Sequence, residues 1–134
     1  MTDYFSLNLT DEEINSISSL GLAYLGDSVF ELMVRSWLCS RGGVTSSGLH
    51  REAVKYVSAQ AQAQAARRVL PELTDAEKGV FRRARNTKVH SVPQNADISD
   101  YHAATGLEAL FGWLYLKGNK ERLNQLFQLI MGDR

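Results

Sequence analysis

Two acidic residues stand alone inside strongly apolar stretches of this sequence. Asp27 lies in GLAYLGDSVFELMVR, residues 21–35, and Glu108 lies in TGLEALFGWLYL, residues 105–116. A carboxylate is costly to bury unless it is paired or binds something. Both stretches have the character of helices, and carboxylates on two facing helices can share a hard cation such as Mg²⁺, which commonly takes one or two protein carboxylates together with a substrate phosphate. The two residues therefore indicate a candidate metal site.

Gly26 comes directly before Asp27 in the same predicted helix. Glycine inside a helix costs about 1 kcal/mol relative to alanine. One reason to accept that cost is the close approach of another backbone or of a ligand. The alternative is a solvent-facing Asp27 beside a glycine at an ordinary helix crossing.

Three kinds of function are compatible with two such carboxylates. A cation held between them could activate a water molecule and stabilise a phosphodiester under attack. The same residue types could serve as acid and base in sugar cleavage, which a basic segment and an all-helical chain make less attractive. A helical scaffold for protein contacts, without any chemistry, is the third interpretation.

Positive charge is concentrated in residues 78–90, although the whole chain balances fifteen basic residues with fifteen acidic ones. The segment contains no acidic residue. Such a run is usually a solvated helix face. Here the helical pattern ends at Asn86 and the chain enters a loop, Val89–Ile98, where cationic side chains could reach phosphates. The five basic residues are Lys78, Arg82, Arg83, Arg85 and Lys88.

Helices must position these residues, and the first two are predicted near the N-terminus. Thr10 and Glu13 have the spacing of a capping box, which should start a short helix. A longer helix should follow from Gly21 to about Cys39, ended by Gly42. The residues expected to face inward from these two helices are Ile14, Ile17, Leu20, Leu22, Leu25, Val29, Leu32 and Met33.

The middle of the chain is predicted as one long helix. Thr45, Ser46 and Ser47 offer N-caps, and the helix should run to about Leu70, where Pro71 ends it. Its alanine- and glutamine-rich segment AQAQAQAAR, residues 59–67, is interpreted as high helix propensity and tight packing through small residues.

Three further helices complete the chain. The first begins at a second capping box, formed by Thr74 and Glu77, and carries most of the basic segment. The other two are expected over Tyr101–Lys117, capped by Ser99 or Asp100, and over Lys120–Met131, capped by Asn119.

Length and composition set the broad class. The 134 residues are 44% hydrophobic, which suits one compact domain, residues 1–134, with residues 1–9 as a loose arm. The single cysteine, Cys39, excludes an internal disulfide and fits a reducing compartment. The N-terminus does not have the pattern of a signal peptide, and no apolar run is long enough to span a bilayer. We therefore expect a soluble, cytoplasmic, all-α domain.

Two segments resemble a known family. Leu25-Gly26-Asp27-Ser28-Val29, followed far downstream by Glu108-Ala109-Leu110-Phe111-Gly112, resembles the catalytic domain of the ribonuclease III family. The short length, the segments AYLGDSVFELMVR and FRRARNTK, and the lack of a double-stranded-RNA-binding domain are similar to its small branch, the Mini-III ribonucleases. The resemblance covers residues 15–130, which is nearly the whole chain.

The resemblance implies a ribonuclease III-like homodimer that holds double-stranded RNA in a valley across both subunits. It implies that Asp27 and Glu108 are catalytic and bind Mg²⁺, with Mn²⁺ as a substitute, in a hydrolysis that leaves a 5′-phosphate and a 3′-hydroxyl. It also implies that Tyr24 packs into the partner subunit near the two-fold axis. The expected activity is endoribonuclease cleavage in ribosomal RNA maturation, on a large-subunit precursor. The residues expected to contact RNA are Arg82, Arg83, Arg85, Asn86 and Lys88.

The sequence departs from the longer ribonuclease III enzymes at two positions. Ala23 and Thr105 stand where those enzymes carry two more acidic residues, and Mini-III enzymes show a similar reduction. The number of metal ions per site is left open by this loss, and the alternative function is a catalytically weak RNA-binding or ribosome-associated protein on the same fold. Glu31 is expected at the surface, with support of the metal site as the alternative. His102 is interpreted as a capping or packing residue.

Overall fold

The structure is a computed structural model that describes residues 1–43, 45–87 and 97–132. Across these ranges the regular elements are helices, and no strand is formed. The all-α class expected from the sequence is therefore confirmed. In chain order the elements are α1 (Asp11–Asn15), α2 (Ser19–Arg41), α3 (Ser46–Val57), α4 (Ala59–Val69), the short 3-10 helix η1 (Leu70–Glu72), α5 (Asp75–Arg85), α6 (Ile98–Leu116) and α7 (Lys120–Met131).

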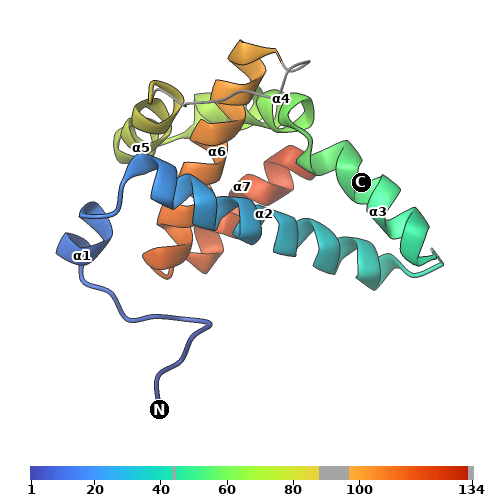
Figure 1. Ribbon diagram of the computed structural model, residues 1–134, viewed down its shortest axis with the longest axis horizontal. Coiled ribbons are helices and arrows are strands. Elements are labelled where there is room, and N and C mark those ends of the chain that lie inside the picture. The colour runs from blue at the N-terminus through green and yellow to red at the C-terminus, as the bar shows by residue number, and fades with distance from the viewer. Residues whose placement is uncertain (44, 88–96, 133–134) are drawn as a thin grey trace.

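Helices α2 and α6 cross at the centre of the molecule, and the other helices are arranged around this pair (Figure 1). Phe30 on α2 and Phe111 on α6 are almost completely buried, and their rings meet edge to face with centroids 5.3 Å apart. Phe127 on α7 makes a similar contact with Phe30 at 6.0 Å. This geometry is favoured because the positive edge of one ring meets the negative face of the other. The core thus holds the two central helices in a fixed crossing.

Local capping chemistry sets several helix starts as the sequence predicts. Thr10 and Glu13 exchange two hydrogen bonds, of 3.0 and 3.1 Å, at the start of α1. Thr74 and Glu77 do the same at the start of α5, at 2.9 and 3.2 Å. The Asn119 side chain caps α7, whose bounds are those expected. These caps satisfy backbone N–H groups that the first turn of a helix leaves free.

The long helix predicted to run to Leu70 is wrong, because the chain forms two helices that meet at Ser58. Ser58 has an extended backbone, with φ −63° and ψ 154°, and its hydroxyl accepts a hydrogen bond from the Ala61 N–H at 3.2 Å. Serine competes for backbone groups in this way and therefore favours caps over helix interiors. The break turns α4 away from α3.

The predicted start of α6 is also wrong by three residues. The helix begins at Ile98, and the cap is Asp97, which accepts a hydrogen bond from the Asp100 N–H at 3.1 Å, rather than Ser99 or Asp100 itself. Several short polar residues occur together here, and each is a good N-cap. Their types alone do not show which one leaves the helical conformation.

Two leucines of α1–α2 do not face the core as expected. Leu20 is 38% exposed and Leu32 is 61% exposed, whereas Phe30 and Val34 are buried. Helix α2 is apolar on more than one side, so its periodicity does not show which apolar side meets the core. The structure therefore leaves part of the apolar surface of α2 uncovered.

A buried ion pair holds α7 against the start of α5. Arg122 Nε and Nη2 donate to the two carboxylate oxygens of Glu77 at 2.8 and 2.9 Å, and Nη2 also donates to the Glu72 carbonyl oxygen at 2.8 Å. Burial alone would raise the pKa of Glu77, but the hydrogen bonds from Arg122 and Thr74 outweigh it and lower that pKa. Glu77 is thus ionised and paired.

The N-terminal residues lie outside the helices as an extended arm (Figure 1). The Tyr115 hydroxyl of α6 donates to the Phe5 carbonyl oxygen, which ties the arm to the helical body. The side chains of Tyr4 and Phe5 remain exposed. Across the described ranges, none of the helices has both the length and the apolar character needed to cross a membrane.

Candidate functional site

The crossing of α2 and α6 is built on two glycines that let the backbones touch. A Cβ atom placed on Gly26 would lie 1.5 Å from the Glu108 carbonyl oxygen, and one on Gly112 would lie 2.1 Å from the Leu22 carbonyl oxygen. Both positions are far inside van der Waals contact, so only glycine fits at either place. Close backbone approach was one of the two explanations that the sequence left open for Gly26, and the structure shows it, with the turn of α6 that includes Glu108 as the partner. Asp27 itself is exposed, as in the other explanation.

This contact brings the two carboxylates of interest together at one crossing. Asp27 follows Gly26 and is exposed, whereas Glu108 is half-buried between the helices. Burial, followed by the neighbouring Asp27 carboxyl, which acts as hydrogen-bond partner and as charge, raises the pKa of Glu108 to about 9. Two adjacent carboxyls disfavour ionisation of one another. In the metal-free protein at neutral pH, Glu108 therefore keeps a proton next to Asp27.

Glu31 also influences Glu108. Glu31, one turn beyond Asp27, adds negative charge that raises the pKa of Glu108, although less than burial and Asp27 do. Glu31 is half-buried, and its carboxylate pairs with Arg35 at 2.8 Å. The expectation that Glu31 is only a surface residue is therefore incomplete, because its charge reaches the site.

Gln62 on α4 is the residue at this site that sequence reasoning missed. It is 2% exposed, and its side chain lies close enough to the Glu108 carboxyl to lower the pKa of that group. The segment AQAQAQAAR offers three glutamines, Gln60, Gln62 and Gln64, and only the middle one is buried. The sequence could have indicated Gln62 only as a polar residue on the same helix face as the alanines that pack inward.

The donor set fits a hard divalent cation that also binds substrate. No group of three or more His, Cys, Asp or Glu side chains in the described part of the chain is arranged to hold a metal ion. The site therefore offers the two carboxylates of Asp27 and Glu108, and Mg²⁺ commonly uses one or two carboxylates plus substrate phosphates and water. If both carboxyls were ionised they would repel one another, and a cation bound between them would relieve that repulsion.

The two positions that lack an acidic residue contribute no ligand in its place. Ala23 is 7% exposed within the helix packing. Thr105 is also 7% exposed, and its hydroxyl donates to the Tyr101 carbonyl oxygen at 3.0 Å. Packing and a local hydrogen bond thus account for both residues.

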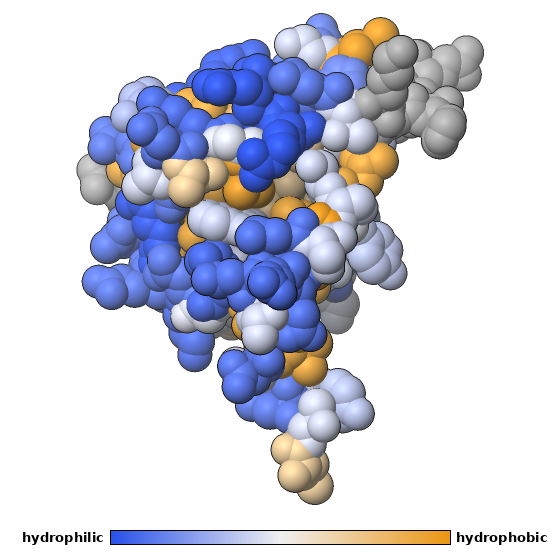
Figure 2. Space-filling model, turned by 90° about the vertical axis from the view of Figure 1, so that its left-hand side faces the viewer, coloured by the Kyte–Doolittle hydropathy of each residue, from blue (hydrophilic) through white to orange (hydrophobic). Residues whose placement is uncertain are grey.

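The predicted RNA-contact residues lie on and just after α5, which packs against α6 and α2. Arg82 and Arg83 are exposed, Arg85 is half-buried with its guanidinium 5.8 Å from the centre of the Phe81 ring, and Asn86 ends the helix. The side of the molecule that includes α5 is mostly hydrophilic (Figure 2). Lys88 and most of the loop predicted over Val89–Ile98 lie outside the described residues.

A hollow of about 380 Å³ lies where α4, α5 and α6 meet. Among its lining residues are Arg67, Arg85, Asn86 and His102. The Nδ1 atom of His102 is buried without a hydrogen-bond partner in the described part of the chain, so the capping or packing role expected for this residue stays a prediction. The basic side chains thus border a hollow of mixed polar and apolar lining near the beginning of α6.

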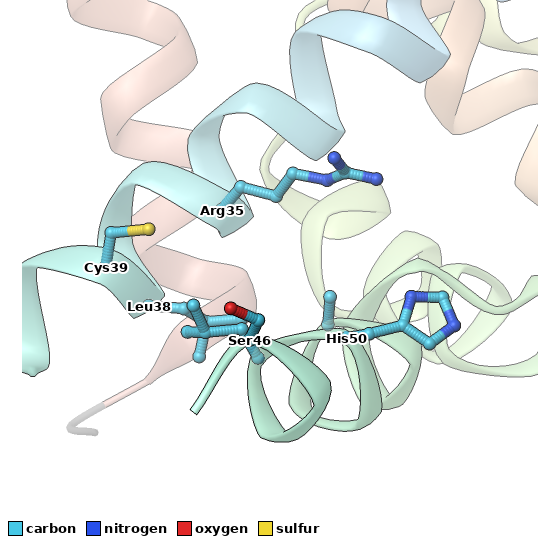
Figure 3. A pocket seen from close by; sticks show the side chains of 7 residues that line it. Arg35, Leu38, Cys39, Ser46 and His50 are labelled. Carbon is cyan, nitrogen blue, oxygen red and sulfur yellow. The ribbon is translucent and has the colours of Figure 1, made fainter. Parts of the chain in front are cut away.

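A second hollow, of about 250 Å³, lies between α2 and α3 (Figure 3). Its polar lining includes Arg35, Cys39, Ser46 and His50, and neither Asp27 nor Glu108 borders it. It has no carboxylate in its lining and is therefore separate from the candidate metal site.

Tyr24 lies on α2 one turn before Asp27, but it points away from the core. Its side chain is 85% exposed and is followed on the helix by the exposed Leu32. A large aromatic side chain this exposed, next to other exposed apolar residues, is typical of a surface that contacts another protein.

Comparison with known proteins gives consistent results over most of the chain. A family model described as "Ribonuclease III domain" matches residues 20–119. A protein named "Mini-ribonuclease 3" from Symbiobacterium thermophilum is 48% identical over 84% of this chain and 87% of its own length. A protein of the same name from Staphylococcus aureus is 35% identical over 92% of this chain and 94% of its own. A crystal structure of a Fusobacterium nucleatum protein superposes with a TM-score of 0.81 at 27% identity, covering 88% of this chain and 96% of that one.

Proposed function

This chain belongs to the ribonuclease III family, in its Mini-III branch, and is an endoribonuclease that acts on double-stranded RNA; from this premise we propose that Asp27 and Glu108 are its catalytic, metal-binding residues. The observation that supports this most directly is the contact between Gly26 and the α6 backbone, which brings the two carboxylates together. The alternative of a catalytically weak RNA-binding protein is less well supported, because this chain aligns with relatives named Mini-ribonuclease 3 over nearly their whole length.

Asp27 and Glu108 would hold Mg²⁺, with Mn²⁺ as a substitute, through carboxylate oxygens. The bound ion would stabilise the negative charge that develops on the phosphodiester under attack. Because carboxylates must be ionised to bind a metal, Glu108 gives up its proton when the cation binds. Asp27 is exposed and therefore accessible to the backbone of an RNA duplex. Hydrolysis at this position leaves a 5′-phosphate and a 3′-hydroxyl.

The basic residues of α5 would hold the duplex next to this site. Arg82 and Arg83 are exposed, and neither has a salt bridge to an acidic side chain within the described residues. Such cations contact phosphates without reading the base sequence. Arg85 and Asn86 follow on the same helix end, and Lys88, which lies outside the described residues, is proposed from the sequence alone.

The enzyme would work as a homodimer in which Tyr24 packs against the partner subunit. Two sites related by a two-fold axis could cut the two strands of one duplex. The substrate we propose is a double-stranded segment of a ribosomal RNA precursor from the large subunit, cleaved in the cytoplasm. The name shared by the relatives is consistent with this role.

Cleavage by charge-neutral variants tests the site. Asp27→Asn and Glu108→Gln should each reduce cleavage of generic double-stranded RNA in Mg²⁺ to the background level, while binding of the duplex in Ca²⁺ stays close to that of the wild type. Asp75→Asn and Glu121→Gln change exposed carboxylates on α5 and α7 and should cleave normally. Near-normal cleavage by Asp27→Asn or Glu108→Gln would remove the assignment.

A further inference from the structure

Gln62 is a buried polar residue whose side-chain NH₂ group has no hydrogen-bond partner within the described residues. The structure buries three polar or charged residues within the described ranges, which are Gln62, Glu77 and Thr105. Glu77 is paired with Arg122, and Thr105 donates to a backbone carbonyl. The Nε2 atom of Gln62, in contrast, is buried without a partner of good hydrogen-bond geometry in the described part of the chain. Leaving a buried donor unsatisfied destabilises a fold, so the position of Gln62 calls for an explanation.

The position of Gln62 is set by helix packing. Helix α4 lies against α6, and the alanines that flank Gln62 on its buried side, Ala63 and Ala66, are each 1% exposed. These small side chains let the two helices approach closely. The Gln62 side chain then approaches the Glu108 carboxyl from α4, while Asp27 approaches it from α2. Glu108 therefore lies between an acidic neighbour and an amide.

The amide of Gln62 is complementary to Glu108 in its ionised form. An ionised carboxylate only accepts hydrogen bonds, whereas the NH₂ group of glutamine only donates them. Hydrogen bonds to charged acceptors are also stronger than neutral ones.

We propose that Gln62 is a positioning residue for Glu108, whose Nε2 donates to one carboxylate oxygen and leaves the other oxygen directed toward Asp27 and the cation. This inference rests on the proposed function, in which Asp27 and Glu108 form the metal site. Groups that hydrogen-bond to a metal ligand fix its orientation, and their removal commonly costs 10- to 100-fold in metal affinity or activity. Gln62 does not itself contact the metal or the RNA in this arrangement.

The test compares metal binding by Gln62→Met with that by a matched control. Methionine has a similar length and shape but cannot donate a hydrogen bond. Gln64→Met makes the same change on the same helix at an exposed position. Binding of Mn²⁺ without RNA, measured by electron paramagnetic resonance, should be about tenfold weaker for Gln62→Met and unchanged for Gln64→Met. With RNA, kcat should fall for Gln62→Met, while KM for the duplex stays the same.

A packing role for Gln62 gives different results. It predicts that Gln62→Met lowers thermal stability and leaves the Mn²⁺ affinity of the folded protein unchanged, and this outcome would overturn the proposal. A positioning role predicts unchanged or higher stability in the absence of metal, because the variant removes an unsatisfied buried donor. If Gln62→Met does not fold, the Mn²⁺ affinity of Gln62→Ala is compared with that of the wild type instead. Alanine is the residue type that already packs on either side of Gln62 in α4.

One more variant separates this inference from the proposed function. Glu108→Gln should abolish Mn²⁺ binding, and adding Gln62→Met to it should have no further effect. If Glu108→Gln binds Mn²⁺ as the wild type does, the metal site itself is wrong. If Glu108→Gln loses binding but Gln62→Met retains the full affinity, only the role of Gln62 is wrong.

Discussion

Glu108 is in an environment that disfavours its own charge. It is half-buried, next to Asp27, and within the influence of Glu31. A fold selected only for stability would place an apolar residue or a paired acid here, as the fold does with Glu77 and Arg122. Unpaired carboxylates of this kind are commonly retained for function at some cost in stability. This contrast within one chain supports a metal-binding role for Glu108.

The raised pKa of Glu108 predicts how the stability of the metal-free protein depends on pH. Glu108 titrates near pH 9 in the folded state and near 4.5, the value of an ordinary glutamate, in the unfolded state. Between these values the folded state holds a proton that the unfolded state has lost, so this group makes the free energy of unfolding fall as pH rises. The fall is at most about 1.4 kcal/mol per pH unit. Below pH 4.5 and above pH 9 the contribution should be constant.

Comparison with Glu108→Gln isolates this contribution, since all other titrating groups are shared. In the presence of a chelator, the variant should be more stable than the wild type, and its advantage should grow from pH 5 to pH 8. Chemical denaturation at several pH values measures the difference. A difference that does not change with pH would show that Glu108 is ionised at neutral pH in the folded protein.

At the scale of single residues, the sequence predicts the acidic pair but not its surroundings. Asp27 and Glu108 could be identified because each interrupts an apolar helix, which is a chemical oddity visible without coordinates. Gln62 could not, because Gln60, Gln62 and Gln64 are chemically identical and only the rotation of α4 decides which is buried. The influence of Glu31 likewise depends on how α2 is oriented against α6.

At the scale of helices, the crossing of α2 and α6 decides whether the site exists. Gly26→Ala would place a methyl group 1.5 Å from the Glu108 carbonyl oxygen, so the helices must separate. Alanine would favour the isolated helix by about 1 kcal/mol, but this gain is small beside a clash between two backbones. We expect a lower melting temperature and a loss of cleavage, measured by thermal unfolding and with generic double-stranded RNA.

Gly21→Ala on the same helix is the matched control. Its Cβ atom would lie 3.1 Å from Ile17 Cγ2 and 3.1 Å from Ser18 Oγ, which are side-chain atoms and can shift. Cleavage and stability should therefore stay close to those of the wild type. Full activity of Gly26→Ala would mean that the backbone contact does not set the geometry of the two carboxylates.

Helix α5 provides a second test at this scale, through the salt dependence of RNA binding. If Arg82 and Arg83 contact phosphates, binding releases counterions, and the logarithm of affinity falls steeply with the logarithm of salt concentration. Replacing one of them with glutamine should reduce this slope by about 1, with a similar loss for different duplex sequences. Duplex binding across a salt series in Ca²⁺, which suppresses cleavage, measures the slope.

Lys120→Gln serves as the control for α5, because Lys120 is an exposed cation at the start of α7. Its salt slope should equal that of the wild type. If Arg82→Gln and Arg83→Gln also retain the full slope, these arginines form a solvated face, and the RNA-contact role fails while the catalytic assignment stands.

The helices themselves were predictable where the signal is local. The capping boxes at Thr10 and Thr74 involve residues three positions apart, so the sequence contains all the information they need. The break at Ser58 was not foreseen because a single serine lies between stretches with helical patterns, and the cap at Asp97 was not foreseen because several polar residues compete there. Tertiary packing selects among them, and that information is spread over the chain.

At the scale of the whole molecule, three apolar side chains of α2 are exposed in the described part of the chain. Leu20, Tyr24 and Leu32 are 38%, 85% and 61% exposed, and their spacing places them along one broad side of the helix. Exposed apolar side chains that occur singly are ordinary, but a row of them indicates a protein contact. The prediction that Leu20 and Leu32 face the core failed because an exposed apolar surface on a helix has the same periodicity as a core face.

A charge placed on this side of α2 should therefore separate the subunits. We expect the wild-type protein to sediment as a dimer at micromolar concentration and Tyr24→Glu to sediment as a monomer, because two buried carboxylates would meet near the two-fold axis. Tyr4→Glu changes a tyrosine that is 82% exposed on the N-terminal arm and should remain dimeric.

Monomeric Tyr24→Glu should retain its helical circular dichroism and Mn²⁺ binding, since Asp27 and Glu108 belong to one chain. It should bind duplex RNA more weakly, because a valley that spans two subunits would be halved. Analytical ultracentrifugation and duplex binding in Ca²⁺ measure the two effects. A wild-type protein that is a stable monomer with full activity would contradict the dimer and leave the exposed side of α2 to a different partner.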